Sequence, residues 1–98
     1  MKTKIIILIF ALSSPFMIAQ EKLADKFFDN FSYIKAIELY EEVIKKGDSS
    51  EHVLTRLGDC YYNNSKSEKA GFWYGKALKK YKNINPEFIY KYIQTQRS

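Results

Sequence analysis

The chain has 98 residues, which leaves room for one small domain at most. Apolar residues make up 46% of the chain and aromatic residues 16%, which is too much for a disordered tail. The formal net charge of +5 would suit nucleic acid, but the sequence contains no base-reading motif. We therefore expect a packed domain whose partners do not include nucleic acid.

Residues 1–19 have the three-part plan of a secretory signal peptide. A basic stretch, MKTK, precedes the apolar run IIILIFAL, and SSPFMIAQ then interrupts this run. The run is too short for a lasting membrane-spanning helix, although an uncleaved anchor is the alternative. We expect cleavage after Ala19, which would leave an exported domain at 20–98.

Charge is distributed unevenly along the remaining chain. Residues 20–50 hold five lysines against seven acidic residues, a net charge of −2, and residues 51–98 hold nine basic against four acidic residues, a net charge of +5. The basic half favours an anionic envelope partner or an acidic neighbouring domain. A basic stripe could touch anionic lipid or wall polymer, or could be only a solvated helix face; it consists of Lys76, Lys79, Lys80 and Lys82.

The expected domain matches itself when it is shifted along the chain so that Leu23 falls on Leu57. The same shift, without insertion or deletion, pairs further identical residues: Asp25 with Asp59, Asn30 with Asn64, Lys35 with Lys69, Ala36 with Ala70, and Tyr40 with Tyr74. A fixed period of this length is typical of stacked supersecondary units. We expect a first repeat at 20–50, a second at 51–84 and the start of a third at 85–98.

In the first repeat, apolar spacing predicts two helices. The first is marked by Leu23, Ala24 and Phe27, and the second by Ala36, Tyr40, Val43 and Ile44. Gly47 suits the C-cap of the second helix.

The second repeat follows the same plan. Its first helix is marked by Val53, Leu54, Leu57, Gly58 and Tyr61, and its second by Ala70, Trp73, Tyr74, Ala77, Leu78 and Tyr81. Two capping boxes are expected at the helix starts, Asp48 with Glu51 and Ser65 with Glu68. Pro86 suits the first position of a further helix.

Small residues have a packing role in this plan. Gly58 and Ala70 leave room for two antiparallel helices to approach, and Ala77 lets the next helix settle close by. Gly71 and Gly75 each cost about 1 kcal/mol against alanine in a helix interior, so we expect them to lower stability without changing the fold.

Cys60 and His52 are the single cysteine and the single histidine of the chain. One cysteine cannot form an internal disulfide, and a metal centre needs several ligands. On one helix the two side chains would be about 12 Å apart, too far for a nucleophile and its base. We expect a buried packing thiol, no catalytic, cofactor or metal site, and no small-molecule substrate.

The motif LGDCYY, followed by Ala70, Tyr74 and Ala77, resembles the tetratricopeptide repeat signature. The resemblance implies an all-α fold, a right-handed solenoid of about two and a half helix–turn–helix repeats. Its packing positions would be Leu23, Ala24, Phe27, Ala36, Tyr40, Leu57, Gly58, Tyr61, Ala70, Tyr74 and Ala77.

The order of signal peptide and repeats also resembles the N-terminal segment of bacterial OmpA-family envelope proteins. In that family the segment precedes a C-terminal domain that binds peptidoglycan. The resemblance implies a non-catalytic interaction scaffold in the periplasm or associated with the outer membrane. It would be a docking module for protein partners of the cell envelope, with further domains beyond residue 98.

The first helix of each repeat would line the concave face of such a solenoid. The candidate peptide-binding groove consists of Asp25, Phe28, Asp29, Thr55, Asp59, Tyr62, Asn63, Tyr90 and Gln94. We expect an extended peptide or a helix with a basic residue there, or else an ordinary solvated face. Asp25 and Asp59 would repel a C-terminal carboxylate, which argues against a carboxylate clamp.

The last helix suggests an alternative function. Its apolar residues, Phe88, Ile89, Tyr92 and Ile93, have no second helix of the same repeat to cover them. The chain would then be a structural subunit that assembles through this face, with a second copy of itself, another domain or a separate partner.

Overall fold

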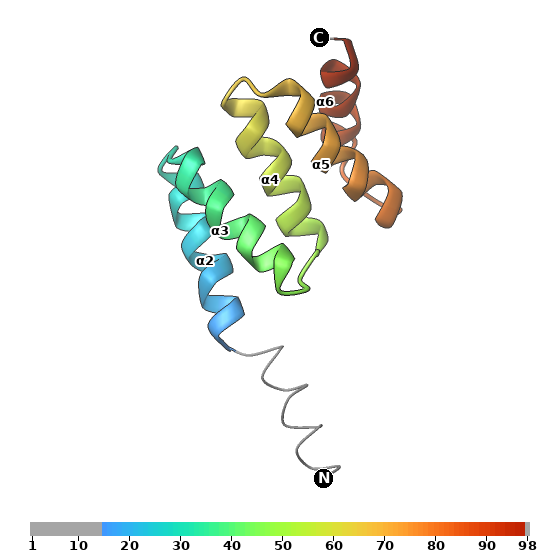
Figure 1. The fold of residues 1–98 in the computed structure, drawn as a ribbon. Coiled ribbons are helices and arrows are strands. Elements are labelled where there is room, and N and C mark those ends of the chain that lie inside the picture. Colours follow the sequence, from blue (N-terminus) through green and yellow to red (C-terminus); the bar gives the residue numbers. More distant parts are fainter. Residues whose placement is uncertain (1–14, 98) are drawn as a thin grey trace, which may run out of the picture.

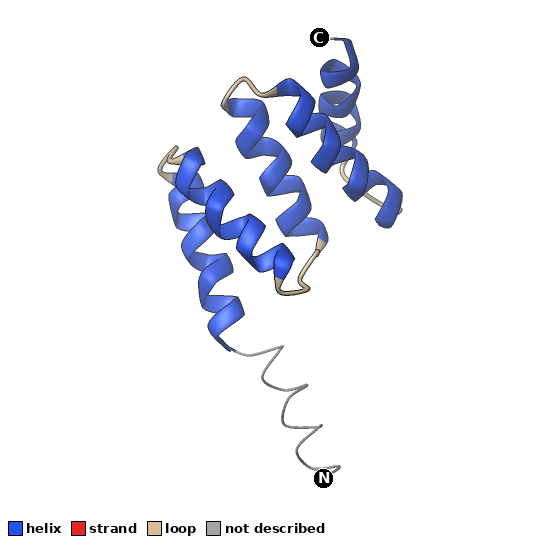
Figure 2. Cartoon of the chain, viewed as in Figure 1, coloured by secondary structure: helices blue, strands red, loops and turns tan. Residues whose placement is uncertain are grey.

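The computed structural model describes residues 15–97, and every regular element in this part of the chain is a helix (Figures 1 and 2). The helices are α2 (Pro15–Asp29), α3 (Tyr33–Lys45), α4 (Glu51–Asn63), α5 (Ser67–Lys80) and α6 (Pro86–Arg97). The expected all-α class is confirmed. No helix within residues 15–97 is both long enough and apolar enough to cross a membrane.

The expected signal peptide lies largely outside the described residues. Residues 1–14 are not described, and the expected cleavage position after Ala19 falls inside α2. The signal peptide therefore stays a prediction from the sequence.

The helices stack in chain order. Each helix packs on the next one along the chain, and α2 also touches α4. Figure 1 shows α2 and α3 as one pair on one side of α4, with α5 and α6 on the other side. The central position of α4 explains its burial, since seven of its residues are buried, whereas α6 buries Thr95 alone.

Two apolar clusters hold the stack together. The larger one joins α2, α3, α4 and α5, and its fully buried members include Ala24, Tyr40, Leu57 and Tyr74. The smaller one joins α4, α5 and the loop before α6 through Leu54, Ala77 and Ile84. The stack therefore has a continuous core that passes from one helix pair to the next.

The turn inside each helix pair is the same at both places where it occurs. Phe31 and Ser65, which occupy equivalent positions of the two repeats, both have left-handed backbone, with φ of 62° and 61°. The closing hydrogen bonds also correspond: Ser32 N–H to the Phe27 carbonyl and Lys66 N–H to the Tyr61 carbonyl, each at 2.8 Å. The period found in the sequence is thus also a period of backbone conformation.

The helix starts differ from the expected capping boxes. Ser50, not Asp48, caps α4, and its hydroxyl accepts from Val53 N–H at 3.2 Å. Helix α5 starts at Ser67 without a side-chain cap, because Ser65 belongs to the left-handed turn. Both capping-box predictions were wrong, since a motif of two residues does not specify the register of the turn.

The expected helix end and the last helix start are confirmed. Gly47 has φ of +104° directly after α3, and the Asp48 N–H reaches back to the Val43 carbonyl, as in a Schellman motif. Pro86 is the first residue of α6.

The glycines of α4 and α5 are positions of close approach. A Cβ on Gly58 would lie 2.5 Å from ring carbons of Tyr74, so this glycine makes room for the tyrosine ring rather than for Ala70. A Cβ on Gly71 would lie 2.7 Å from the Thr95 hydroxyl. A similar contact occurs at Gly75, whose Cβ would lie 3.2 Å from the ring of Tyr92 on α6. The two glycines of α5 thus let α6 approach, a role that sequence alone did not indicate.

Two expectations about apolar residues need correction. Leu23, expected at a packing position, is 45% exposed although its equivalent Leu57 is fully buried. The two leucines differ in burial because their helices differ in position. Helix α4 has helices on both sides, whereas within the described residues α2 has neighbours on one side only. On α6, Phe88 and Tyr92 pack against the core. Of the four apolar residues expected to be uncovered, only Ile89 and Ile93 are therefore exposed.

Candidate interaction site

A tyrosine–aspartate pair recurs inside both helix pairs. The Tyr40 hydroxyl donates to Asp25 Oδ1, and the Tyr74 hydroxyl donates to Asp59 Oδ1. Burial, with the hydrogen bond to aspartate, raises the pKa of each phenol far above its ordinary value. Asp25 and Asp59, two of the three aspartates of the candidate groove, therefore already accept a hydrogen bond from their own repeat.

The same aspartates also contact the next repeat. His52 Nε2 on α4 lies 2.9 Å from Asp25 Oδ1, and Lys91 Nζ on α6 lies 3.2 Å from Asp59 Oδ1. Lys91 also pairs with Glu87 at 3.1 Å. Burial lowers the pKa of Lys91, but the Glu87 and Asp59 carboxylates outweigh it and raise the pKa. Each aspartate thus links its own helix pair to the following helix.

The groove aromatics face cations in a similar way. The Arg56 guanidinium lies 4.4 Å from the centre of the Phe28 ring and 3.7 Å from Asp29 Oδ1. Lys91 Nζ lies 5.7 Å from the centre of the Tyr62 ring, at the position equivalent to Phe28. Such contacts are favourable when the cation lies over the ring within about 6 Å. The predicted acidic and aromatic groove is largely neutralised by basic residues of this chain.

The remaining groove residues are divided between interior and surface. Thr55 is buried, and its hydroxyl donates to the Glu51 carbonyl at 2.8 Å, so it does not offer a contact on an open face. Asn63 and Tyr90 are exposed, and Gln94 is half-buried. The structure places Asp25, Phe28, Asp29, Asp59 and Tyr62 in paired contacts, whereas Asn63 and Tyr90 are exposed to solvent.

Cys60 is the buried packing thiol that the sequence predicts, since it is fully buried in the main cluster. Burial, assisted by the neighbouring Asp59 charge, raises the pKa of Cys60 to about 12. His52 is turned toward Asp25 instead of serving as a base for the thiol.

The native protein should therefore resist alkylation of Cys60 by iodoacetamide at pH 8, while the protein unfolded in guanidinium should react fully. The pKa of an unfolded thiol is about 8.5. The folded value is higher, so the contribution of Cys60 to stability is complete below about pH 8.5 and is lost as the pH rises toward 12. Mass spectrometry of the timed reaction measures this difference. Equal rates in native and unfolded protein would contradict the assignment.

One cluster has the residue types of a metal centre. The possible ligand atoms of Glu21, Asp25 and His52 lie within 4.8 Å of one another. Burial, followed by the neighbouring Asp48 carboxyl, raises the pKa of Glu21. Sequence reasoning missed this cluster because only the packing of α2 against α4 brings it together. The hydrogen bonds of Asp25 to His52 and Tyr40 account for its geometry, and we infer no metal site from it.

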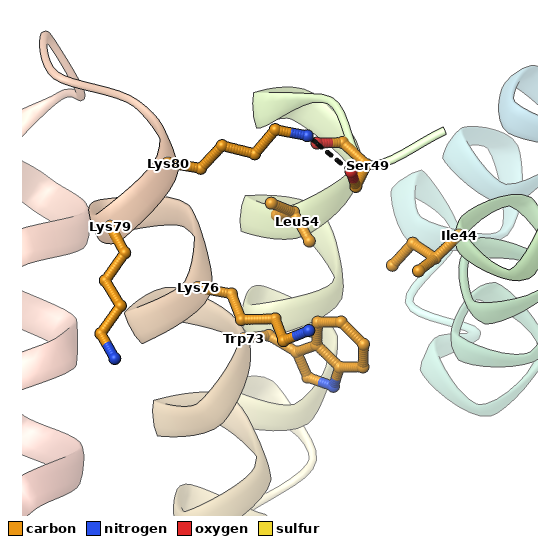
Figure 3. Close-up of a pocket in the computed structure, with 7 residues that line it drawn as sticks. All are labelled: Ile44, Ser49, Leu54, Trp73, Lys76, Lys79 and Lys80. Atoms are coloured by element: carbon orange, nitrogen blue, oxygen red, sulfur yellow. Dashed lines mark hydrogen bonds between the residues drawn. The ribbon is translucent and has the colours of Figure 1, made fainter. Parts of the chain in front are cut away.

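A cleft of about 260 Å³ opens between α3 and α5. Its apolar lining comes from three helices, with Ile44 from α3, Leu54 from α4 and Trp73 from α5. Figure 3 shows Lys76 extended over Trp73, and Lys80 reaching across to Ser49. Lys79 completes the lining on the α5 side. We call this site the outer cleft; the sequence indicated its lysines but not the hollow beside them.

The lysines of the outer cleft contact neutral partners. Lys80 Nζ donates to the Ser49 hydroxyl at 2.6 Å and to the Ser49 carbonyl at 3.0 Å. Lys76 Nζ lies 5.7 Å from the centre of the Trp73 ring and 5.3 Å from that of Phe72. The cleft therefore combines an apolar lining with a cationic rim.

Comparison of the chain with protein-family models, with curated proteins and with solved structures gave no significant match.

Proposed function

We propose that this chain is a non-catalytic protein–protein interaction scaffold built from tetratricopeptide-type helical repeats. The observation that carries the proposal is the recurrence of the same contacts at equivalent positions of the two repeats. The left-handed turn recurs at Phe31 and Ser65, and the hydroxyl-to-aspartate hydrogen bond recurs at Tyr40 and Tyr74. Arrays of such units present extended surfaces on which other chains dock.

The proposed setting is the bacterial cell envelope, in which the chain acts as an N-terminal docking module of an OmpA-like, peptidoglycan-associated protein. This part rests on the sequence resemblance and on the signal-peptide pattern of residues 1–19. The partners are envelope proteins, and wall binding belongs to domains beyond residue 98.

A second candidate function is assembly through α6. Ile89 and Ile93 are 43% and 48% exposed and are one helical turn apart, so they share one face of the helix. The neighbouring Tyr90 is 62% exposed. This observation favours a structural subunit whose last helix is covered by a second copy or by another chain.

Site-specific photo-crosslinking in intact envelopes tests both candidates. A photoreactive phenylalanine analogue is introduced singly at Asn63 on α4, at Lys79 beside the outer cleft and at Ile93 on α6. A discrete adduct with a different protein at Asn63 or Lys79 supports the scaffold. An adduct with twice the mass of the chain, formed only at Ile93, supports assembly through α6. The absence of an adduct at all three positions would sink both proposals.

A further inference from the structure

We infer that the outer cleft binds an acidic peptide segment of a protein partner, and that this segment inserts one apolar side chain between α3 and α5. The inference rests on the proposed function as an interaction scaffold. It specifies where a partner docks and what chemistry that partner has. The docking site is the outer cleft and not the concave groove that the sequence predicts.

The charge of the cleft favours an acidic partner. Within residues 15–97, no carboxylate lies within ion-pair distance of Lys76, Lys79 or Lys80, although all three line one cleft. On the opposite groove, by contrast, Arg56 and Lys91 each pair with an aspartate. Three uncompensated cations along one helix create a positive potential that attracts an anionic partner. The basic residues Arg56 and Lys91 of the groove are thus already paired with carboxylates, whereas, in the part of the chain that the structure describes, the lysines of the cleft are not.

The apolar lining of the cleft favours the insertion of an apolar side chain. Ile44 and Trp73 are half-buried and face the hollow, above a Leu54 side chain that is 2% exposed. Water held there against apolar surface is released when an apolar side chain enters, which favours binding. A free phosphate or a wholly polar polyanion would not use this lining.

The size and shape of the cleft favour a peptide over a cofactor or a lipid surface. A cleft of about 260 Å³ is below the usual range of about 300–1,000 Å³ for small-molecule sites, and it fits a single side chain better than a cofactor. A flat lipid surface would meet the exposed ends of Lys76 and Lys79 but would not reach Leu54 at the bottom of the hollow. A peptide satisfies both features, since its carboxylates meet the lysines while one apolar side chain enters.

The fluorescence of Trp73 can report binding in the cleft. Trp73 is the single tryptophan of the chain, so tryptophan emission comes from the cleft alone. The probe is a short peptide without tryptophan, in which one phenylalanine lies between pairs of glutamates. Titration of the full chain with this peptide is expected to shift and saturate the Trp73 emission. A second peptide with serine in place of phenylalanine is expected to bind at least tenfold more weakly.

Charge reversal identifies the residues responsible. The double variant Lys76→Glu/Lys79→Glu should weaken binding of the phenylalanine peptide by at least tenfold, because attraction becomes repulsion. The matched control, Lys22→Glu/Lys26→Glu on α2, changes the net charge equally but lies outside the cleft, and its affinity should stay within twofold. Circular dichroism checks that both variants keep their helices.

Three results would overturn the inference. Trp73 emission could stay unchanged at millimolar peptide, both double variants could weaken binding equally, or vesicles of phosphatidylglycerol could shift the emission where the peptide does not. The last result would assign the cleft to lipid. Photo-crosslinks to a partner at Asn63 without peptide binding would leave the scaffold function intact and remove only the cleft as its site.

Discussion

Replacing Tyr74 with alanine is expected to lower the free energy of unfolding by about 4 kcal/mol. The ring is fully buried, and it packs against the rings of Tyr62 and Phe88 at centroid distances of 6.2 and 6.0 Å. Its hydroxyl donates to Asp59. The loss approaches the total stability of a small domain, about 5–15 kcal/mol.

Urea unfolding followed by circular dichroism measures this loss, and two further variants divide it into parts. Tyr74→Phe keeps the ring and removes only the hydrogen bond, which should cost about 1 kcal/mol. Tyr90→Ala removes a tyrosine that is 62% exposed and should cost little. If the alanine variants at 74 and 90 were equally stable, Tyr74 would not be the centre of the core.

Gly58→Ala is expected to lower the free energy of unfolding by about 2 kcal/mol, even though alanine is the better helix former. Alanine gains about 1 kcal/mol of helix propensity, whereas overpacking costs about 1–3 kcal/mol and here lies at the upper end. The new Cβ would lie 2.5 Å from ring carbons of a Tyr74 that is fully buried and tied to Asp59, so the ring has no free direction in which to move.

The matched control is Ala24→Gly at the equivalent position of the first repeat. It removes a buried methyl group and helix propensity without a clash, so it should cost about 2 kcal/mol. Thermal unfolding should place Gly58→Ala about 10 °C below the parent protein. A Gly58→Ala protein as stable as the parent would show that the tyrosine ring has room to shift.

The helix order and most of the packing positions could be predicted because the same residue pattern occurs twice in the sequence. Tyr40 and Tyr74 occupy equivalent places in two copies of one pattern, and the same holds for Asn30 and Asn64 beside the turns. Buried Cys60 followed from the absence of a second ligand or base in reach. These recurring residues pack within one helix pair. The spacing of apolar residues along a helix indicates which of them pack in this way, so contacts within a pair can be predicted from the sequence.

Contacts between repeats could not be predicted in this way. His52 and Lys91 fulfil the same role toward Asp25 and Asp59, yet they do not occupy equivalent positions. The shift that carries Asp25 to Asp59 carries His52 to Pro86. From the sequence, these aspartates were therefore predicted to line an open groove. Their partners depend on how one helix pair sits on the next, which no spacing within a pair specifies.

The outer cleft had a partial signal in the sequence. The lysine stripe beside Trp73 was visible, but Ile44 and Leu54 were interpreted only as apolar positions of two other helices. Their convergence on one hollow results from the stacking of α3, α4 and α5. A candidate site that draws on three elements becomes visible only when their relative positions are known.

The uneven burial of the helices also sets the order in which amide hydrogens exchange with solvent. Helix α4, with seven buried residues, opens only when the whole domain unfolds, whereas α6, which buries Thr95 alone, can separate from α5 by a local fluctuation. A chain that covers Ile89 and Ile93 would slow exchange in α6 and leave α4 unchanged. The last helix is thus the part of the molecule that a binding partner would stabilise most.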